Sequence, residues 1–145
     1  MKSTNFAKRL LLAVWISCLA PAFADTPDIA IPDREAALLK TTDYVEVTGT
    51  NDLGGKEDFT IHDYKAIRQF VELLTDTRYT AVPKSLKPDF KSASAYQVRL
   101  SHQGAVILQL HVIADSVLDL PAESSFYMQS DRHSDNLMAP LLRLR

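Results

Sequence analysis

The spacing of hydrophobic positions changes abruptly within residues 59–74, FTIHDYKAIRQFVELL. Phe59 and Ile61 alternate with polar neighbours, which is typical of a strand with one buried face. Asp63 then stands where a helix N-cap belongs, because its carboxylate can accept hydrogen bonds from the free N–H groups of the first turn. The apolar residues that follow have the i, i+3, i+4, i+7 spacing of an amphipathic helix: Ile67, Phe70, Val71 and Leu74. The pattern predicts a strand over 57–62 and a helix over 63–75, with this stripe in the core.

Weaker alternation predicts several other strands. Val45 and Val47 alternate with polar residues, which indicates a half-buried strand over 43–48. The glycine-containing segment 49–56, GTNDLGGK, differs from the phosphate-binding motif GxxxxGK[ST] in both possible registers, and a strand follows it where that motif needs a helix. We interpret it as a hairpin loop. Short strands are also expected over 79–82, 117–120 and 126–129.

Two short helices are expected near the ends of the chain. Asp33 is suited to cap a helix over 34–40, for which the alternative is a partly ordered arm. A weak helix over 131–145 should be kinked or divided by Pro140, which lacks a backbone N–H.

Residues 96–114 predict a hairpin whose register depends on its turn. A two-residue turn at Gln103-Gly104 would pair the apolar face of one strand with the mixed face of the other. A three-residue loop, 102–104, keeps the apolar faces together and puts Gly104 where a left-handed residue is needed. We therefore expect the pairs Leu100–Val106, Val98–Leu108 and Tyr96–Leu110 on one face, with Gln97–Gln109, Arg99–Ile107 and His111 near Ala95 on the other.

These elements predict an α+β fold. We expect a mainly antiparallel sheet of five or six strands, one face of which is covered by the helix over 63–75, with a short C-terminal helix. Residues 25–42 are interpreted as an arm or short helix, and residues 43–145 as a single domain, which is the natural number for a chain of this length.

The first 24 residues have the pattern of a secretory signal peptide. Three basic residues precede an apolar run over 10–20, and small residues lead to Ala24, after which cleavage is expected. The run is too short to span a bilayer, and no second such run follows, so no integral membrane segment is expected in the mature chain. The alternative is a lipid-anchored form acylated at Cys18, but Trp15 stands where that signal expects a Leu-like residue.

The composition of the mature chain indicates which partners and which cell compartment are compatible with it. Cleavage leaves 13 Lys and Arg against 18 Asp and Glu, a net charge of −5, which argues against a nucleic-acid partner. Cys18 is the only cysteine, so the mature chain would contain no disulfide. This composition fits a periplasmic protein better than an extracellular one, because small extracellular domains usually carry disulfides.

Polar residues on the mixed sheet face are the candidate binding site. His111 shares one strand with Gln109, and Arg99 lies on the partner strand. The strand over 43–48 carries Tyr44 and Glu46 on its polar side, and we assign them to the same face. Tyr44, Glu46, Arg99 and His111 could bind a polar ligand or a carboxylate, whereas the alternative is an ordinary solvated sheet face.

One basic loop is a second contact candidate. Residues 83–95 carry Lys84, Lys87 and Lys91, which suit an acidic partner or a simple exposed connector.

Motifs of metal binding and catalysis are weak. The four histidines are not spaced as HxH or HExxH, so no metal site or cofactor is expected. The run 131–135, DRHSD, has the residue types of a hydrolytic triad, but a triad is assembled from separate segments, and caps of a helix are the simpler interpretation.

The expected function is a periplasmic binding or accessory protein that neutralises or inhibits a protein partner or binds a small polar ligand. The alternatives are a small hydrolase with residues from remote segments and a structural envelope component.

Overall fold

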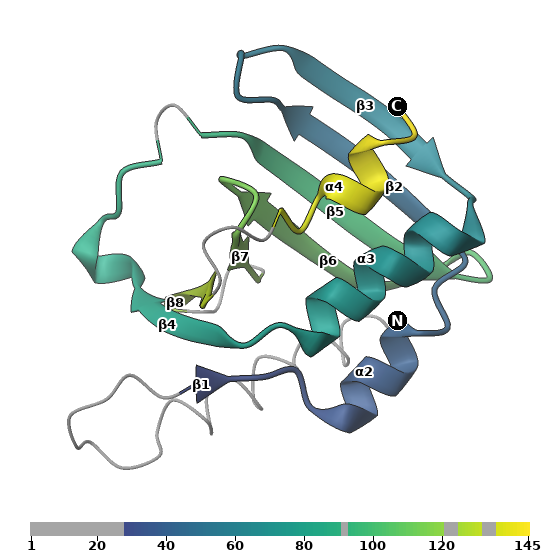
Figure 1. Cartoon of the computed structure of the whole chain (residues 1–145), viewed down its shortest axis with the longest axis horizontal. Helices are drawn as coiled ribbons and strands as arrows, with labels where there is room; N and C mark the ends of the chain where they lie inside the picture. Colours follow the sequence, from purple (N-terminus) through teal and green to yellow (C-terminus); the bar gives the residue numbers. More distant parts are fainter. Residues whose placement is uncertain (1–27, 91–92, 121–124, 132–135) are drawn as a thin grey trace.

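The computed structural model describes residues 28–90, 93–120, 125–131 and 136–145. They form an α+β fold with one antiparallel sheet, as predicted (Figure 1). The expected signal peptide over 1–24 lies outside these residues, as do residues 121–124, Lys91 and His133.

The helix predicted from the apolar stripe is confirmed as α3 (Tyr64–Asp76). Its N-cap is Asp63, whose carboxylate accepts a hydrogen bond from the backbone N–H of Ala66 at 2.7 Å. All four stripe residues are buried, and Phe70 and Leu74 have no exposed surface. The helix ends at Asp76, and the backbone of the C-cap residue Thr77 is extended.

Within the described residues the sheet has eight strands, in the order β1-β4-β8-β7-β6-β5-β2-β3. The prediction of five or six strands was therefore too low. Seven of the eight strands coincide with segments that the sequence predicts as strands, and the eighth, β1, has only two residues, too few to show an alternating pattern. The bounds are β1 (Asp28–Ile29), β2 (Tyr44–Thr50), β3 (Lys56–Ile61), β4 (Tyr79–Pro83), β5 (Ala95–His102), β6 (Ala105–Ile113), β7 (Val117–Asp119) and β8 (Phe126–Ser130).

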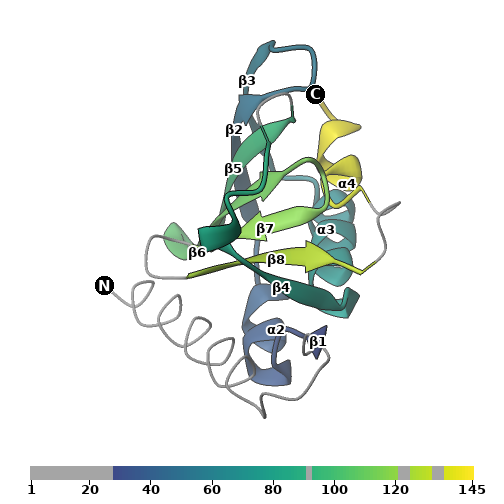
Figure 2. The same cartoon turned by 90° about the vertical axis from the view of Figure 1, so that its left-hand side faces the viewer.

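Three helices pack on the sheet face that the sequence assigned to one helix. Figures 1 and 2 show α2 (Asp33–Leu39) and α4 (Ala139–Leu142) flanking α3 on the same side of the sheet. Leu39 and Leu141 are fully buried there. Neighbouring strands lie about 4.8 Å apart, so one helix is too narrow to cover so many strands, and the two short helices extend the covering layer.

Both short helices differ in detail from their predictions. Asp33 is the first residue of α2 and does not cap it, because Pro32 takes the N-cap position. The carboxylate of Asp33 then lies in the first turn, where the helix dipole favours an acid. Of the helix expected over 131–145, the described residues contain the four residues of α4, and Pro140 lies in its first turn. Proline is well suited to that position, so it begins the helix instead of kinking it.

The hairpin of β5 and β6 has a different register from the predicted one. Its turn is the two-residue Gln103-Gly104, and both residues have positive φ, 48° and 77°. Leu100 pairs with Leu108 and Ser101 with Val106, so Ile107 is an extra residue in β6. This β-bulge brings the apolar faces back together after the short turn. The prediction placed the irregularity in the turn itself and was shifted by two residues.

The loop between β2 and β3 is shorter than the predicted 49–56, because β2 continues through Gly49 to Thr50. Gly49 lies opposite Tyr96 of β5, and a Cβ built on it would be 2.2 Å from the carbonyl oxygen of Ala95. Glycine is therefore needed for the close approach of these two strands.

Candidate functional site

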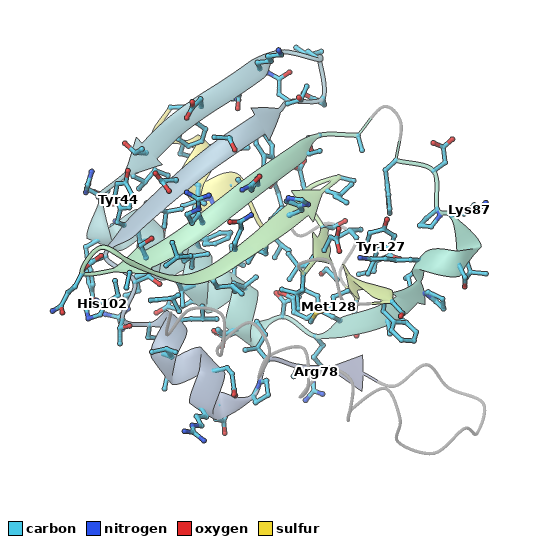
Figure 3. All side chains as sticks on the ribbon, turned by 180° about the vertical axis from the view of Figure 1, so that it is seen from behind. Tyr44, Arg78, Lys87, His102, Tyr127 and Met128 are labelled. Atoms are coloured by element: carbon cyan, nitrogen blue, oxygen red, sulfur yellow. The ribbon has the colours of Figure 1, made fainter. Side chains whose placement is uncertain are left out.

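The four residues proposed from the sequence share the sheet face opposite the helices. Val45, Val47 and Leu100 are buried against the helices, so their strand neighbours Tyr44, Glu46 and Arg99 face the other way. Figure 3 looks onto this second face and labels Tyr44 at one end of it. No helix among the described residues covers it.

Three strands place Glu46, Arg99 and Gln109 directly beside one another. Glu46 pairs with Arg99 across β2 and β5, and Arg99 pairs with Gln109 across β5 and β6. The guanidinium Nη1 of Arg99 donates to Glu46 Oε2 at 3.2 Å, and its Nε donates to Gln109 Oε1 at 3.4 Å. The Tyr44 hydroxyl donates to Glu46 Oε1 at 3.5 Å. We call Tyr44, Glu46, Arg99 and Gln109 the polar row.

The polar row depends on the register that the sequence did not predict. The expected partner of Arg99 was Ile107, which could not bind its guanidinium. The bulge at Ile107 places Gln109 opposite Arg99 instead, and the amide oxygen of Gln109 holds the Nε group.

His62 contacts Tyr44 at the end of the polar row. It follows β3 directly, and its ring lies 4.7 Å from the ring of Tyr44, centroid to centroid, with the planes tilted by 45°. Tyr44 is half-buried and His62 is exposed, so the pair presents an aromatic surface beside the charges of Glu46 and Arg99.

His111 belongs to a second group on the same face. It pairs with Gln97 of β5 and Asp119 of β7. Its Nδ1 lies 3.8 Å from Asp119 Oδ2, while Lys84 Nζ donates to Asp119 Oδ1 at 2.6 Å. The Lys84 ammonium also lies 5.1 Å from the centroid of the Tyr127 ring. We call His111, Asp119, Lys84 and Tyr127 the Asp119 group.

The sequence analysis named His111 and Lys84 as separate candidates but missed Asp119 and Tyr127, because the four residues come from four separate elements. The basic character of residues 83–95 did not indicate which residue Lys84 would bind. Lys84 of that segment is held by an acid of the same chain, and its side chain is 28% exposed. Lys87 is exposed and has a left-handed backbone, with φ 47°. The loop that contains the two lysines thus packs partly on its own sheet.

A shallow hollow of about 220 Å³ lies between β3, β2 and β5 beside the polar row. Its charged lining consists of Glu46, Asp58 and Arg99, and the other lining residues are Thr48, Thr60 and Gln97. Because Glu46 already pairs with Arg99, the carboxylate of Asp58 leaves the hollow with a net charge of −1. This balance favours cationic or neutral hydrogen-bonding groups over a carboxylate.

A larger hollow lies on the helix side of the sheet, and nothing in the sequence pattern indicated it. It is a groove of about 680 Å³ between the C-terminal half of α3 and α4. Its lining combines apolar residues such as Leu73 and Pro140 with charged residues of both signs, among them Asp76 and Arg143.

Glu57 is the centre of an ionic contact that ties the chain end to the sheet. Its carboxylate accepts hydrogen bonds from Asn51 Nδ2 and the Tyr96 hydroxyl, both at 3.1 Å, and pairs with Arg145. The hydrogen bond from Asn51, with those from Tyr96 and Arg145, holds the pKa of Glu57 below its usual range. Burial and the bond to Glu57 raise the pKa of Tyr96 to about 12. Both groups therefore keep their ordinary charge states near neutral pH.

Among the described residues, the histidines do not belong to a group of side chains that could bind a metal ion. His102 Nδ1 lies 3.4 Å from Asp43 Oδ2 at the hairpin end, and no described cluster of three His, Cys, Asp or Glu residues is suited to a metal ion. Residues 132–135 of the triad-like run lie outside the described structure. Asp131 accepts a hydrogen bond from the Thr80 hydroxyl at 2.5 Å.

Comparison with known proteins finds no matching family model, no matching curated protein and no matching solved structure. Among the described helices, none has both the length and the apolar character needed to cross a membrane.

Proposed function

We propose that this chain is a binding or accessory protein of the periplasm, without enzymatic activity, and that its open sheet face binds a protein partner through the polar row. The observation that carries the proposal is the one-sided packing of the sheet. All three described α-helices lie on one face, while the opposite face presents Arg99 fixed between Glu46 and Gln109. Side chains held in this way lose less conformational entropy when a partner binds.

The size of the hollow supports a protein partner over a small ligand. Small-molecule sites usually enclose about 300–1,000 Å³, and the hollow beside the polar row measures about 220 Å³. A protein surface does not need an enclosing pocket, because it can lie across the strands and place individual side chains in shallow hollows. The net negative charge of this hollow suits a lysine, arginine or amide side chain of the partner.

The alternative of a hydrolase receives less support from the geometry. A hydrolytic His111 should lie in a pocket beside a buried carboxylate. Its side chain is 51% exposed, and Asp119 lies 3.8 Å away with its other oxygen bound to Lys84. None of the hollows described above is lined by His111. The alternative of a structural envelope component predicts self-association, which sedimentation of the mature chain would detect.

Export is the second part of the proposal, and it rests on the residue pattern of 1–24. Protein recovered from the envelope of an expressing bacterium should begin at Asp25, as measured by intact mass and N-terminal sequencing. A chain that begins at Met1 would contradict export, and a diacylated chain that begins at Cys18 would support the lipid-anchored alternative instead.

A photo-crosslinking amino acid tests the proposed binding face. Thr48 is exposed and lines the hollow, so a crosslinker at this position should form an adduct with a partner from the envelope. The matched control is the same crosslinker at Lys65, which is exposed on α3 behind the sheet. The proposal is supported if Arg99→Ala abolishes the Thr48 adduct. Equal adducts from both positions, or an adduct that persists in Arg99→Ala, would contradict it.

A further inference from the structure

The groove between α3 and α4 has the size of a small-molecule site, in contrast to the hollow on the open sheet face. Its volume of about 680 Å³ lies within the range of about 300–1,000 Å³ that is usual for ligand pockets. It is also built from remote parts of the chain, since α3, the connection to β4, the residue after β8 and α4 all contribute. A ligand here would contact several packed elements at once.

The groove combines an apolar lining with charges of both signs. Leu73 of α3 and Pro140 of α4 contribute apolar surface. Glu72, Asp76 and Arg143 are among its charged lining residues, and all three are exposed. This combination suits a molecule that has an apolar body and carries both a positive and a negative group.

Two of the charged side chains remain available for such a ligand. Glu72 is paired with Arg68 at 2.9 Å. Within the described part of the chain, by contrast, neither the Asp76 carboxylate nor the Arg143 guanidinium takes part in a hydrogen bond or ion pair. Asp76 is the last residue of α3, where the helix dipole adds to the negative potential and favours a bound cation.

We propose that the groove binds a short peptide with free termini. Its ammonium group pairs with Asp76, its carboxylate pairs with Arg143, and an apolar side chain packs against Leu73 and Pro140. Arginine is suited to the carboxylate because its guanidinium can bind both oxygens at once. A peptide fits better than one free amino acid because the groove is much larger than a single residue requires. This site lies on the helix side of the sheet and is independent of the polar row.

Calorimetric titration with the tripeptide Ala-Leu-Ala tests the proposal. We expect saturable binding to the purified chain, weakened about tenfold or more by N-acetylation or C-amidation, because each modification removes the charge of one terminus and so one of the two ion pairs with the groove. Asp76→Asn and Arg143→Gln should each weaken binding of the free peptide by a similar factor. The effects should be selective, so that Asp76→Asn does not further weaken the N-acetylated peptide and Arg143→Gln does not further weaken the C-amidated one.

Matched controls separate this site from general charge effects and from the sheet face. Asp52→Asn and Arg34→Gln change exposed residues outside the groove and should leave the affinity unchanged. Arg99→Ala should also leave it unchanged, so a failure of the partner-binding proposal would not affect this one. The peptide proposal is overturned if no saturable binding occurs up to about 5 mM peptide, if the blocked peptides bind as well as the free one, or if free leucine binds as tightly as the tripeptide.

Discussion

Arg99 is exposed on the open sheet face, and its ion pair should contribute little to the stability of the fold. Its side chain is 42% exposed and that of Glu46 is 37% exposed. Ion pairs at this level of exposure typically contribute about 0 to 1 kcal/mol. Removing Arg99 should therefore change the surface of the sheet without unfolding the protein, which makes it suitable for separating binding from stability.

Phe70 has the opposite role, because its side chain is fully buried under the sheet. Phe70→Ala should reduce the free energy of unfolding by about 3 to 5 kcal/mol, through lost burial and the cavity left behind. Urea denaturation would measure the loss. The control is Tyr64→Ala on the same helix, where the side chain is 65% exposed and the effect should stay within about 0.5 kcal/mol. A loss below about 1 kcal/mol for Phe70→Ala would contradict the burial of the stripe.

Glu57 links stability to pH. Its folded-state pKa is lowered from 4.5, first by the hydrogen bond from Asn51. Its carboxylate therefore stabilises the fold above the unfolded pKa, and this contribution is lost as the pH falls through the folded pKa. Glu57→Gln should be less stable than the parent chain near neutral pH, and the difference should shrink in acid. Urea midpoints measured from about pH 7 to about pH 2 test this, and a difference independent of pH would refute it.

At the scale of elements, Gly49 controls how closely β2 and β5 approach. A methyl group there would collide with the carbonyl of Ala95, so Gly49→Ala should cost about 3 kcal/mol, the upper end of the usual overpacking range. Gly54→Ala is the control, because Gly54 has φ 80° but no neighbour within 4 Å. It should cost only the conformational term, about 1 kcal/mol. Equal thermal shifts in the two variants would show that the strands separate easily.

The elements that the sequence predicted well are those with a local cause. The position of α3 follows from Asp63 and the apolar stripe, which are all contained within one segment. The register of β5 and β6 is harder to predict, because a two-residue turn with a bulge inside the strand and a three-residue turn with the irregularity in the turn itself both bring the apolar faces together. Alternation of residues alone cannot separate these solutions, since the bulge at Ile107 lies among consecutive apolar residues. The short helix α4 depends on tertiary burial of Leu141 more than on its own pattern.

At the scale of the whole molecule, the sequence predicted which polar residues lie together on the open face of the sheet, but only some of the contacts between them. Tyr44, Glu46 and Arg99 come together as strand alternation and neighbouring strands require. His111 lies on the same face but pairs toward Asp119 and Lys84, because the register and the fold of the 83–95 loop were not predictable from pattern. The α3–α4 groove was missed for the same reason, since remote segments form it.

The molecule therefore has two separate surfaces on opposite sides of one sheet, an open polar face and a groove among helices. The central claim is that the open face binds a protein partner. The most direct test is capture of a partner from the native envelope by the mature chain, compared between the parent chain, Arg99→Ala and the exposed control Lys65→Ala. We predict that Arg99→Ala loses capture by about tenfold or more, equivalent to about 1.4 kcal/mol, with an unchanged melting temperature, while Lys65→Ala captures normally. Undiminished capture by Arg99→Ala, or a loss that accompanies a lower melting temperature, would contradict the claim.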